Sequence, residues 1–464
     1  MKNPVLLFCI IFFAHYIQAQ GPNLIGMTSQ GGVYGNSTII QYTGSDTIVS
    51  KWTNLILEQP EYITLTQAPN GKFYGLTIGG SPLGSGPNYY SSIIEYDYVA
   101  NTSSVMVNFD SAASNNPSGN ITLANDGKLY GTTAYGGANG GGILFSYTPG
   151  GTSVTKLMDM DSFAYPFAPL IQSEDGLLYG STWYNGGNQD GTIFSYNINT
   201  NVYSTLFTLQ SGATIYGGLL EVGRDTFYGL SSFDGNYSGG TLFRYIASAS
   251  TYDDLFDLDA SANPGGALIR ATDGKLYGLT NGDGSGGLGT IFNYDIATAT
   301  YLTLYNFGSA TNDGTRPLGD LYQASDGKLY GMTNEGGLYG GGNIFQYNIS
   351  TSTYASEVNL DSATGGGPYY GHFTEYVSPS GVVSVRDKEF GLYPNPTIGS
   401  FTITNNYPGA LSVQIINLLG ERLKTLTIND SQHSFDISDL AAGIYEVQIS
   451  DENHTLQVMK VVKE

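Results

Sequence analysis

Hydrophobic and polar residues alternate with a period of two along almost the whole chain. No stretch of a dozen residues keeps the 3.6-residue apolar spacing of an amphipathic helix. The protein is therefore predicted to be all-β. Residues 264–304 show four expected strands, named a to d here, at 266–270, 275–280, 290–294 and 300–304. Between strands a and b, Asp273-Gly274 suits a two-residue hairpin turn, whose backbone needs positive φ angles.

This four-strand pattern recurs about seven times between residues 21 and 376. Strand b carries Tyr-Gly in its clearest copies, and strand c reads Ile/Leu-Ile/Phe-x-Tyr. The glycine of the first signature recurs at positions 26, 75, 131, 180, 229, 278 and 331, which gives a period of about 50 residues. Four antiparallel strands in a repeat of this length are typical of a propeller blade.

The two ends of the repeat predict how the blades close into a ring. The chain enters at strand b of one blade, residues 24–28, and leaves with an unpartnered strand a at 368–373. Seven blades, one of them shared between the two ends, leave no strand over. Residues 21–376 are thus predicted to form a seven-bladed β-propeller, closed by N- and C-terminal strands so that no sheet edge is left open.

The repeated tyrosines and glycines are expected to be structural. Tyr130, Tyr179, Tyr277 and Tyr330 occupy one strand position, where a ring can fill the wedge between blades. The glycine that follows lets backbone approach closely. A binding site should instead break the symmetry of the repeat.

Composition removes several kinds of chemistry. Residues 1–20 read as a secretory signal peptide cleaved near Ala19 or Gln20, and the only cysteine, Cys9, lies inside it. Disulfides, Cys-ligated metals and Cys nucleophiles are therefore not expected. Only His372 of the four histidines lies in the predicted propeller, which leaves little for His-dependent catalysis or zinc binding.

Charge and hydropathy narrow the partners. The formal net charge of −22 argues against nucleic acid, whose phosphates would be repelled. No transmembrane segment is expected, because the apolar run at residues 5–13 is too short to span a bilayer. No cofactor is expected either.

A second domain is predicted after a polar linker at residues 377–389. Residues 390–464 show short strands separated by Gly, Asn and Asp turns, which indicates a small immunoglobulin-like β-sandwich. Its landmarks are Leu392, Tyr393, Pro394, Asn395, Pro396, Gly443, Tyr445, Lys460 and Lys463. In this order they resemble the type A C-terminal sorting domain of the type IX secretion system. The resemblance implies that the type IX machinery of Bacteroidota is a partner and that the protein is secreted or displayed on the outer membrane.

The repeats themselves resemble the GloVer tandem repeat of bacterial choice-of-anchor proteins and, more distantly, kelch repeats. Leu-Tyr-Gly-x-Thr, Gly-Gly and Ile-Phe-x-Tyr carry the resemblance across residues 21–376. Strand d has tyrosine where kelch has tryptophan, at Tyr203, Tyr252, Tyr301 and Tyr354. Neither resemblance implies one activity, because propellers host both enzymes and binding modules.

The face that carries the b–c and d–a loops is the expected binding face, since its loops are long and those opposite are tight. The b–c loops of six of the seven repeats carry aromatic residues, at Tyr34, Tyr89, Tyr90, Tyr135, Trp183, Tyr184, Phe233, Tyr237 and Tyr339. Rings beside amide and hydroxyl groups suit stacking on sugars or a polar protein epitope. The alternative is that these rings merely cover the Gly-rich loops.

One loop has features of a calcium site. Asn281, Asp283 and Ser285 supply alternating oxygen ligands, but Phe292 stands where the bidentate acid is expected. A Gly-rich loop without calcium explains the pattern better.

The sequence favours a secreted, non-catalytic propeller that binds a glycan or a protein. One alternative is a glycan-active enzyme that uses a pair of carboxylates. The acidic residues of the repeats, however, are mostly the aspartates of the a–b turns, which belong to the face opposite the expected binding face. The other alternative is a structural or adhesive surface protein with no discrete ligand.

Overall fold

The computed structural model describes residues 22–29, 38–44, 48–51, 64–77, 91–109, 114–184, 190–210, 212–361, 365–377, 390–394, 396–405, 410–417, 422–450 and 455–463. The chain divides into two compact units, one ending at Tyr376 and the other beginning at Val377. Within the described residues the only helical element is a 3-10 turn, η1 (Ala247–Ala249). None of their helices is long and apolar enough to cross a membrane. The predicted signal peptide, Tyr34, Tyr89, Tyr90 and Asn395 lie outside the described residues.

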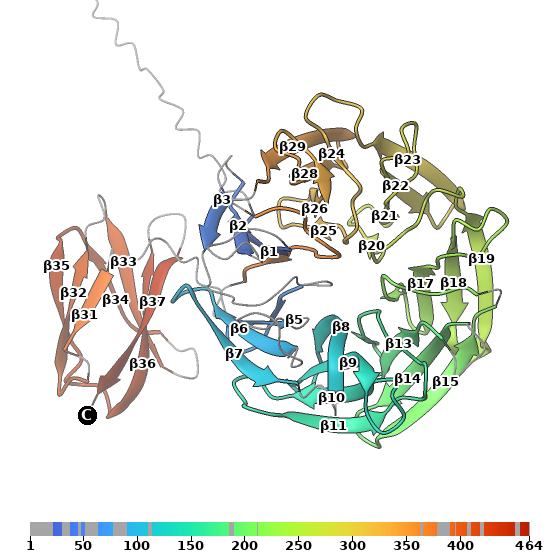
Figure 1. The fold of residues 1–464 in the computed structure, drawn as a ribbon. Coiled ribbons are helices and arrows are strands. Elements are labelled where there is room, and N and C mark those ends of the chain that lie inside the picture. The colour runs from blue at the N-terminus through green and yellow to red at the C-terminus, as the bar shows by residue number, and fades with distance from the viewer. Residues whose placement is uncertain are drawn as a thin grey trace, which may run out of the picture. The chain divides into compact units, whose positions relative to one another are not determined.

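The described part of the first unit contains seven four-stranded antiparallel sheets, which follow one another around a ring (Figure 1). We number them as blades 1 to 7. Blades 2 to 4 comprise β4 (Thr66–Gln67), β5 (Phe73–Thr77), β6 (Ser92–Asp97), β7 (Thr102–Asn108); β8 (Ser114–Leu123), β9 (Leu129–Gly136), β10 (Ile143–Tyr147), β11 (Val154–Asp159); and β12 (Ile171–Gln172), β13 (Leu178–Thr182), β14 (Thr192–Asn197), β15 (Val202–Thr208). Blades 5 to 7 comprise β16 (Leu220–Glu221), β17 (Thr226–Leu230), β18 (Thr241–Ile246), β19 (Thr251–Asp257); β20 (Ile269–Arg270), β21 (Leu276–Thr280), β22 (Thr290–Asp295), β23 (Thr300–Asn306); and β25 (Tyr322–Gln323), β26 (Leu329–Met332), β28 (Asn343–Asn348), β29 (Thr353–Asn359). A two-stranded ladder of β24 (Gly314–Thr315) and β27 (Glu335–Gly336) lies beside blade 7.

Blade 1 closes the ring with strands from both ends of the unit. It comprises β1 (Leu24–Thr28), β2 (Thr38–Tyr42) and β3 (Ile48–Lys51) together with β30 (Thr374–Glu375). The ladder pairs Leu24 with Glu375 and Ile25 with Thr374. The closing strand comes from the C-terminal end, as predicted, but its ladder forms just beyond the predicted 368–373 segment. Phe373 does not pair in this ladder but packs its side chain against Gly26. Its ring lies 2.9 Å from the position that a Cβ on Gly26 would take.

The repeated glycine makes room for an aromatic ring of strand c. A Cβ added to Gly131, Gly180, Gly229, Gly278 or Gly331 would lie 2.4–2.6 Å from a phenylalanine ring atom of the same blade. These rings are Phe145, Phe194, Phe243, Phe292 and Phe345, all fully buried. Any side chain at the glycine would displace the ring, because interiors are close-packed. The repeated glycine is structural, as predicted, but it makes room for a side-chain ring and not for backbone.

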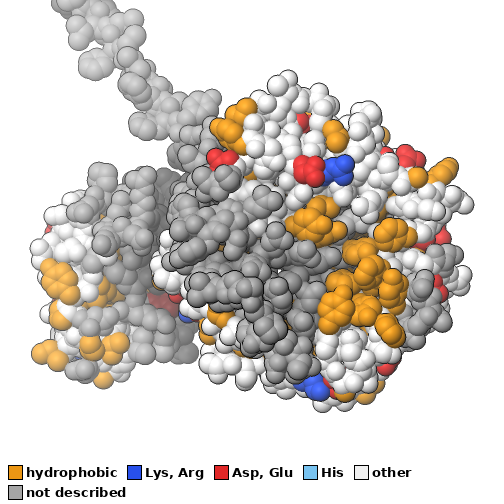
Figure 2. All heavy atoms as spheres, viewed as in Figure 1, with side chains coloured by type: hydrophobic (Ala, Val, Ile, Leu, Met, Phe, Trp, Pro, Cys, Tyr) orange, Lys and Arg blue, Asp and Glu red, His pale blue; other side chains and the backbone are white. Residues whose placement is uncertain are grey.

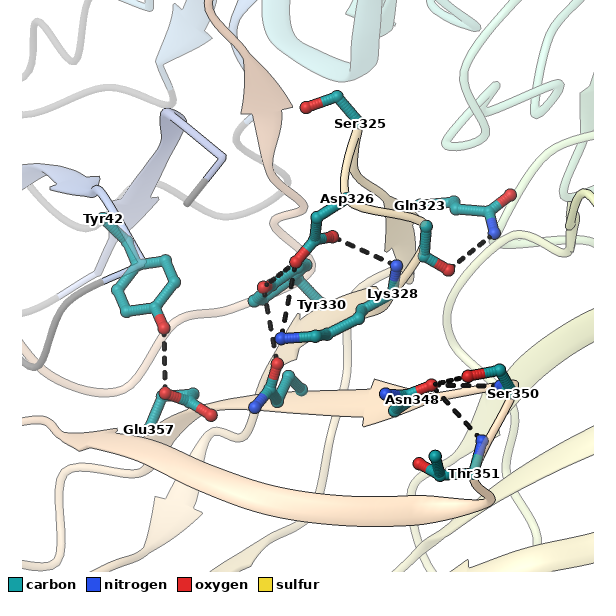
Figure 3. A network of polar contacts seen from close by, with 12 residues as sticks. Tyr42, Gln323, Ser325, Asp326, Lys328, Tyr330, Asn348, Ser350, Thr351 and Glu357 are labelled. Carbon is teal, nitrogen blue, oxygen red and sulfur yellow. Dashed lines mark hydrogen bonds and ion pairs between the residues drawn. The ribbon is translucent and has the colours of Figure 1, made fainter. Parts of the chain in front are cut away.

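The repeated Asp and Tyr of the a–b turn form a small hydrogen-bonded unit. In blade 7, Asp326 accepts hydrogen bonds from the Lys328 backbone N–H at 3.1 Å and from the Tyr330 hydroxyl at 2.8 Å (Figure 3). Burial, and then the hydrogen bond to Asp326, raise the pKa of Tyr330, so the hydroxyl stays protonated as a donor. The same tyrosine-to-aspartate bond occurs at 2.8 Å in blades 3, 4 and 6. The repeated aspartates therefore serve the turns.

Polar contacts also join neighbouring blades. The Tyr42 hydroxyl of blade 1 donates to Glu357 of blade 7 at 2.9 Å (Figure 3). Glu375 in the closing strand accepts from the Ser325 N–H of blade 7 at 2.8 Å. The ring seam is thus held by hydrogen bonds as well as by the β1–β30 ladder.

The second unit is a two-sheet sandwich. One sheet has the order β31 (Phe390–Tyr393), β32 (Ser400–Asn405), β35 (Gln432–Asp436), and the other β34 (Arg422–Ile428), β33 (Leu411–Asn417), β36 (Gly443–Ser450), β37 (Thr455–Lys463). Both sheets contribute buried side chains to a single core. A β-sandwich is thereby observed, and its immunoglobulin-like character stays a prediction.

The sorting landmarks take different positions in this sandwich. Tyr445 is buried and donates its hydroxyl to the Ala441 carbonyl at 2.7 Å. Lys463 is also buried, and its Nζ donates to the Ser438 carbonyl at 2.8 Å and to the Leu440 carbonyl. Tyr393, in contrast, is exposed at the end of β31. Gly443 begins β36, and Lys460 lies within β37.

Candidate ligand-binding site

The b–c loop of blade 4 is tied to the connection that leads into the same blade from blade 3. Trp183 and Tyr184 directly follow β13, and the connection occupies residues 160–170 between β11 and β12. The Trp183 N–H donates to the Ala164 carbonyl at 2.9 Å, and the Tyr184 N–H donates to it at 3.2 Å. These bonds fix the backbone of both aromatic residues against the connection.

Eight aromatic side chains from blades 3 to 5 and their connections contact one another in a continuous series. We call them the aromatic cluster: Tyr135, Phe163, Tyr165, Phe167, Trp183, Tyr184, Tyr216 and Phe233. The Trp183 and Tyr184 rings stack at 5.1 Å between centroids with an interplanar angle of 11°. Trp183 also lies 5.7 Å from Tyr216, which lies 6.4 Å from Phe233. Hydrophobic side chains gather on the face drawn in Figure 2, over β13 and β17, the strands that precede Trp183 and Phe233.

The cluster has a buried support and exposed outer rings. Phe167 is 8% exposed and meets the Trp183 ring edge-on at 5.2 Å. Phe163 and Phe233 are each 54% exposed, and Tyr135 is 41% exposed. Burial, and then the neighbouring Tyr165, raise the pKa of Tyr135, which therefore keeps its hydroxyl proton at neutral pH. Exposed rings on a packed base form a surface that can contact a ligand without rearranging.

Three of these rings are carried by backbone in the left-handed region. Phe163, Tyr165 and Phe233 have φ angles of 66°, 43° and 69°. Bulky residues seldom adopt this region, and each such residue costs on the order of 1–3 kcal/mol. Strain of this kind gathers at functional sites, where the surrounding structure compensates for it.

The predicted aromatic residues divide into two groups. Tyr135, Trp183, Tyr184 and Phe233 belong to the cluster. Tyr237 and Tyr339 are exposed, by 59% and 62%, and neither contacts another aromatic ring in the part of the chain that the structure describes.

Four cluster members were not predicted: Phe163, Tyr165, Phe167 and Tyr216. All four lie on d–a connections, the first three between β11 and β12 and the last between β15 and β16. The sequence assigned d–a loops to the binding face, and the run Phe163-Ala164-Tyr165-Pro166-Phe167 was a signal that could have identified them.

A cavity of about 630 Å³ adjoins the cluster at Phe233. It lies between blades 4 and 5, with Phe207 and Tyr252 among its apolar walls and Asp234, Asp254 and Asp257 as its acidic side chains. The rings of Phe207 and Tyr252 stack at 4.9 Å.

The acids of the cavity differ in how they are held. Asp257 accepts the Asn236 N–H at 3.0 Å and so supports the b–c loop of blade 5. Asp234 accepts the Ser231 hydroxyl at 2.5 Å. Burial, and then the charges of Asp254 and Asp257, raise the pKa of Asp234 to about 6 against the opposing effect of the Ser231 bond. Asp254 is exposed and accepts a long bond of 3.4 Å from the Thr241 hydroxyl.

The calcium candidate is a loop held by strand d. Asp283 accepts the N–H of its neighbour Gly284 at 2.6 Å, and Asn306 accepts the Ser285 N–H at 3.0 Å. In blades 3, 5 and 7 the b–c loop is held in the same way. An Asp or Asn side chain of strand d accepts the N–H of the loop residue that lies 21 positions before it in the chain. The described residues contain no group of three or more His, Cys, Asp or Glu side chains placed to bind a metal ion. Calcium binding at Asn281, Asp283 and Ser285 stays an untested hypothesis.

His372 joins three blades near the ring closure. Its Nδ1 lies 3.1 Å from Asp320 Oδ2 of the blade 7 segment and 3.0 Å from Thr64 Oγ1, which precedes blade 2. Asp320 also accepts the Ala267 N–H at 2.5 Å. These contacts link the histidine to segments on both sides of the ring closure.

The blades and their loop-borne aromatic cluster define a β-propeller with one candidate binding face. The model of the Gloeobacter/Verrucomicrobia repeat matches residues 13–218 and 206–383, and the chain belongs to this repeat family. The secretion system C-terminal sorting domain matches residues 391–464. This confirms the predicted type IX sorting domain, so the protein is exported to the cell surface or secreted. The kelch resemblance stays a prediction.

Several solved structures resemble the chain at low identity. A fungal alcohol oxidase of the AA5 family, in complex with copper, is 12% identical with a TM-score of 0.47, covering 87% of this chain and 97% of that one. PorZ, a surface component of the type IX secretion system of Porphyromonas gingivalis, is 13% identical with a TM-score of 0.42, covering 92% of this chain and 63% of that one. The periplasmic gluconolactonase PpgL of Pseudomonas aeruginosa is 14% identical with a TM-score of 0.46, covering 76% of this chain and all of that one. Likenesses of this degree carry no argument about activity. None of the curated proteins compared with this sequence matches it.

Proposed function

We propose that the protein is a non-catalytic binding module, displayed on the cell surface or secreted, that holds a glycan against the aromatic cluster. One observation carries the proposal: eight contacting rings, several of them exposed, break the symmetry of the repeat in blades 3 to 5. Residues common to every blade maintain the fold, whereas a site for one ligand belongs to a few blades only.

The chemistry of the cluster suits sugars. The flat apolar faces of pyranose rings stack on aromatic side chains, while hydroxyl and amide groups beside the rings can bind sugar hydroxyls. Tyrosine supplies both a ring face and a hydroxyl group, and Tyr165, Tyr184 and Tyr216 belong to the cluster. A protein ligand remains the alternative occupant, since tyrosine-rich loops also bind proteins.

A non-catalytic role fits the use of the acidic residues. The repeated aspartates accept hydrogen bonds in their own turns, as Asp175 does from the Leu177 N–H at 2.8 Å. Hydrolysis of a glycoside needs two carboxyl groups on either side of the bond to be cut. Asp234, Asp254 and Asp257 of the cavity beside the cluster are not turn aspartates of this kind. A glycan-active enzyme that uses two of them is therefore the second proposal, and product analysis after prolonged incubation with any bound glycan would test it.

The proposal is tested by replacing the stacked pair. Trp183→Ala and Tyr184→Ala should each weaken glycan binding by about 1–3 kcal/mol, because each removes a stacking surface at the centre of the cluster. Binding is first identified on a glycan array with the purified full-length mature chain and then measured by calorimetry. Melting temperatures of the same variants separate lost contacts from lost stability.

Tyr339→Ala is the matched control. It removes an exposed tyrosine of blade 7 that lies outside the cluster, so affinity should stay unchanged. A fall in melting temperature for Trp183→Ala without any change in affinity would mean that the rings only cover the loops, and would refute the proposal.

A further inference from the structure

Six rings of the aromatic cluster form a path across three blades. The path runs from Phe163 through Tyr165, Tyr184, Trp183 and Tyr216 to Phe233, with successive centroids 5.1–6.4 Å apart. A surface of this extent offers stacking positions to several sugar units rather than to one.

The path ends at a cavity. Phe233 is both the last ring of the path and part of the cavity wall. The cavity volume of about 630 Å³ falls within the range of small-molecule sites. A chain that stacks along the path can therefore place its end between blades 4 and 5.

The charge around the cavity is of one sign. Asp234, Asp254 and Asp257 line it, and its lining residues that the structure describes include no Lys, Arg or His. The chain as a whole carries a formal net charge of −22. A carboxylate or sulfate on a ligand would be repelled by this field and would find no basic partner in the cavity.

We infer that the aromatic cluster and the cavity form one extended site that selects sugar chains by charge. It accepts polysaccharide chains without acidic groups and rejects those that carry uronate or sulfate. The inference rests on the proposed function and adds the class of glycan and the residues that determine it. Asp254 is the specificity residue most open to substitution, because it is exposed and its side chain accepts a long hydrogen bond, from Thr241 at 3.4 Å.

The test uses pairs of hexasaccharides that differ only in charge. Cellohexaose, mannohexaose and laminarihexaose are each compared with the form oxidised at C6 from hydroxymethyl to carboxylate, using the full-length mature chain in calorimetry. At least one neutral member should bind, and its oxidised partner should bind about tenfold more weakly at low salt. The difference should shrink as salt is raised, because salt screens exposed charges.

The variant Asp254→Asn links the discrimination to the cavity. It should improve binding of the oxidised chain by about threefold and leave the neutral chain unchanged, since one repelling charge is lost. Glu174→Gln is the matched control: it removes one exposed charge at the a–b turn of blade 4, on the opposite face, and should change neither affinity.

The outcomes separate the two proposals. Equal or tighter binding of the oxidised chain overturns selection by charge while leaving glycan binding intact. An unchanged discrimination in Asp254→Asn overturns the role of the cavity. A failure of every chain to bind, neutral or oxidised, overturns the proposed function and this inference together.

Discussion

The glycine of the repeated Tyr-Gly pair is the residue on which blade packing depends most directly. A Cβ on Gly180 would lie 2.5 Å from the Phe194 ring and 2.7 Å from Leu170. Gly180→Ala should therefore lower the free energy of unfolding by about 1–3 kcal/mol, the usual cost of overpacking a core. Denaturant titration measures it. Gly286→Ala is the control, because the nearest atom lies 3.6 Å from its added Cβ, and equal stability losses in both variants would contradict the packing argument.

The raised pKa of Asp234 predicts how the stability of the protein changes with pH. Its pKa is raised to about 6, so between roughly pH 4 and 6 the folded state binds more protons than the unfolded state. The contribution of the Asp234 carboxyl group to folding stability is therefore fully present below roughly pH 4. It is lost as the pH rises from about 4 to about 6. Asp234→Asn should thus stabilise the protein by about 1 kcal/mol at pH 7, discounted for partial exposure, and hardly at all at pH 4.

Denaturant titrations of Asp234→Asn and of the unchanged chain at pH 4 and pH 7 check this prediction. The asparagine can still accept the Ser231 hydroxyl, so that bond is kept. A variant that is less stable than the unchanged chain at pH 7 would show that the charged carboxylate is favoured in the folded state.

At the level of elements, strands b and c could be predicted from the sequence because their alternation and turn residues are local. Predicted strands 275–280 and 290–294 correspond to β21 at Leu276–Thr280 and β22 at Thr290–Asp295. Strand a is shorter than predicted: only Ile269–Arg270 pairs, because the Ala267 N–H donates to Asp320 of the next blade instead of to strand b. Contacts between blades override the local pattern there.

The candidate site was only half predictable for the same reason. Trp183 and Tyr184 stood out because they lie in a b–c loop whose position the repeat fixes. Phe163 and Tyr165 lie in a connection that the repeat does not fix, and their φ angles of 66° and 43° follow no residue preference. The contacts between the rings depend on how neighbouring blades pack against each other. The same holds for the cavity with three acids beside them.

The closing strand β30 predicts the effect of a truncation. A chain that ends at residue 365 loses the β1–β30 ladder, the Phe373 ring against Gly26 and the bond from the Tyr376 N–H to the Asn23 carbonyl at 2.8 Å. Each lost hydrogen bond costs about 1 kcal/mol, and the buried ring adds roughly 2–3 kcal/mol. Its melting temperature should fall well below that of a chain ending at residue 376. Identical melting curves for the two chains would exclude β30 from ring closure.

For the whole molecule, the proposed binding site and the sorting landmarks lie in different units. In the propeller, blades 3, 4, 6 and 7 share the Asp–Tyr turn and blades 3 to 7 share the Gly–Phe packing, so these contacts are spread over most of the ring. The aromatic cluster, in contrast, is confined to blades 3 to 5 and their connections. The sandwich carries the sorting landmarks, and its buried Lys463 and Tyr445 each bond to backbone carbonyls of their own unit. The proposed binding site and the matched sorting domain thus lie in different units, and each can be changed without altering the other.

Truncation after the propeller tests this division. In a host with a working type IX system, the full chain should reach the surface or the medium, whereas a chain ending at residue 376 should stay in the periplasm, because it lacks the matched sorting domain at 391–464. Fractionation followed by immunoblotting measures both. Trp183→Ala in the full chain is the control for a change in the propeller alone, and it should be exported like the unchanged protein. Equal export of the full and truncated chains would show that the sandwich does not direct secretion, and retention of Trp183→Ala would show that the binding face takes part in it.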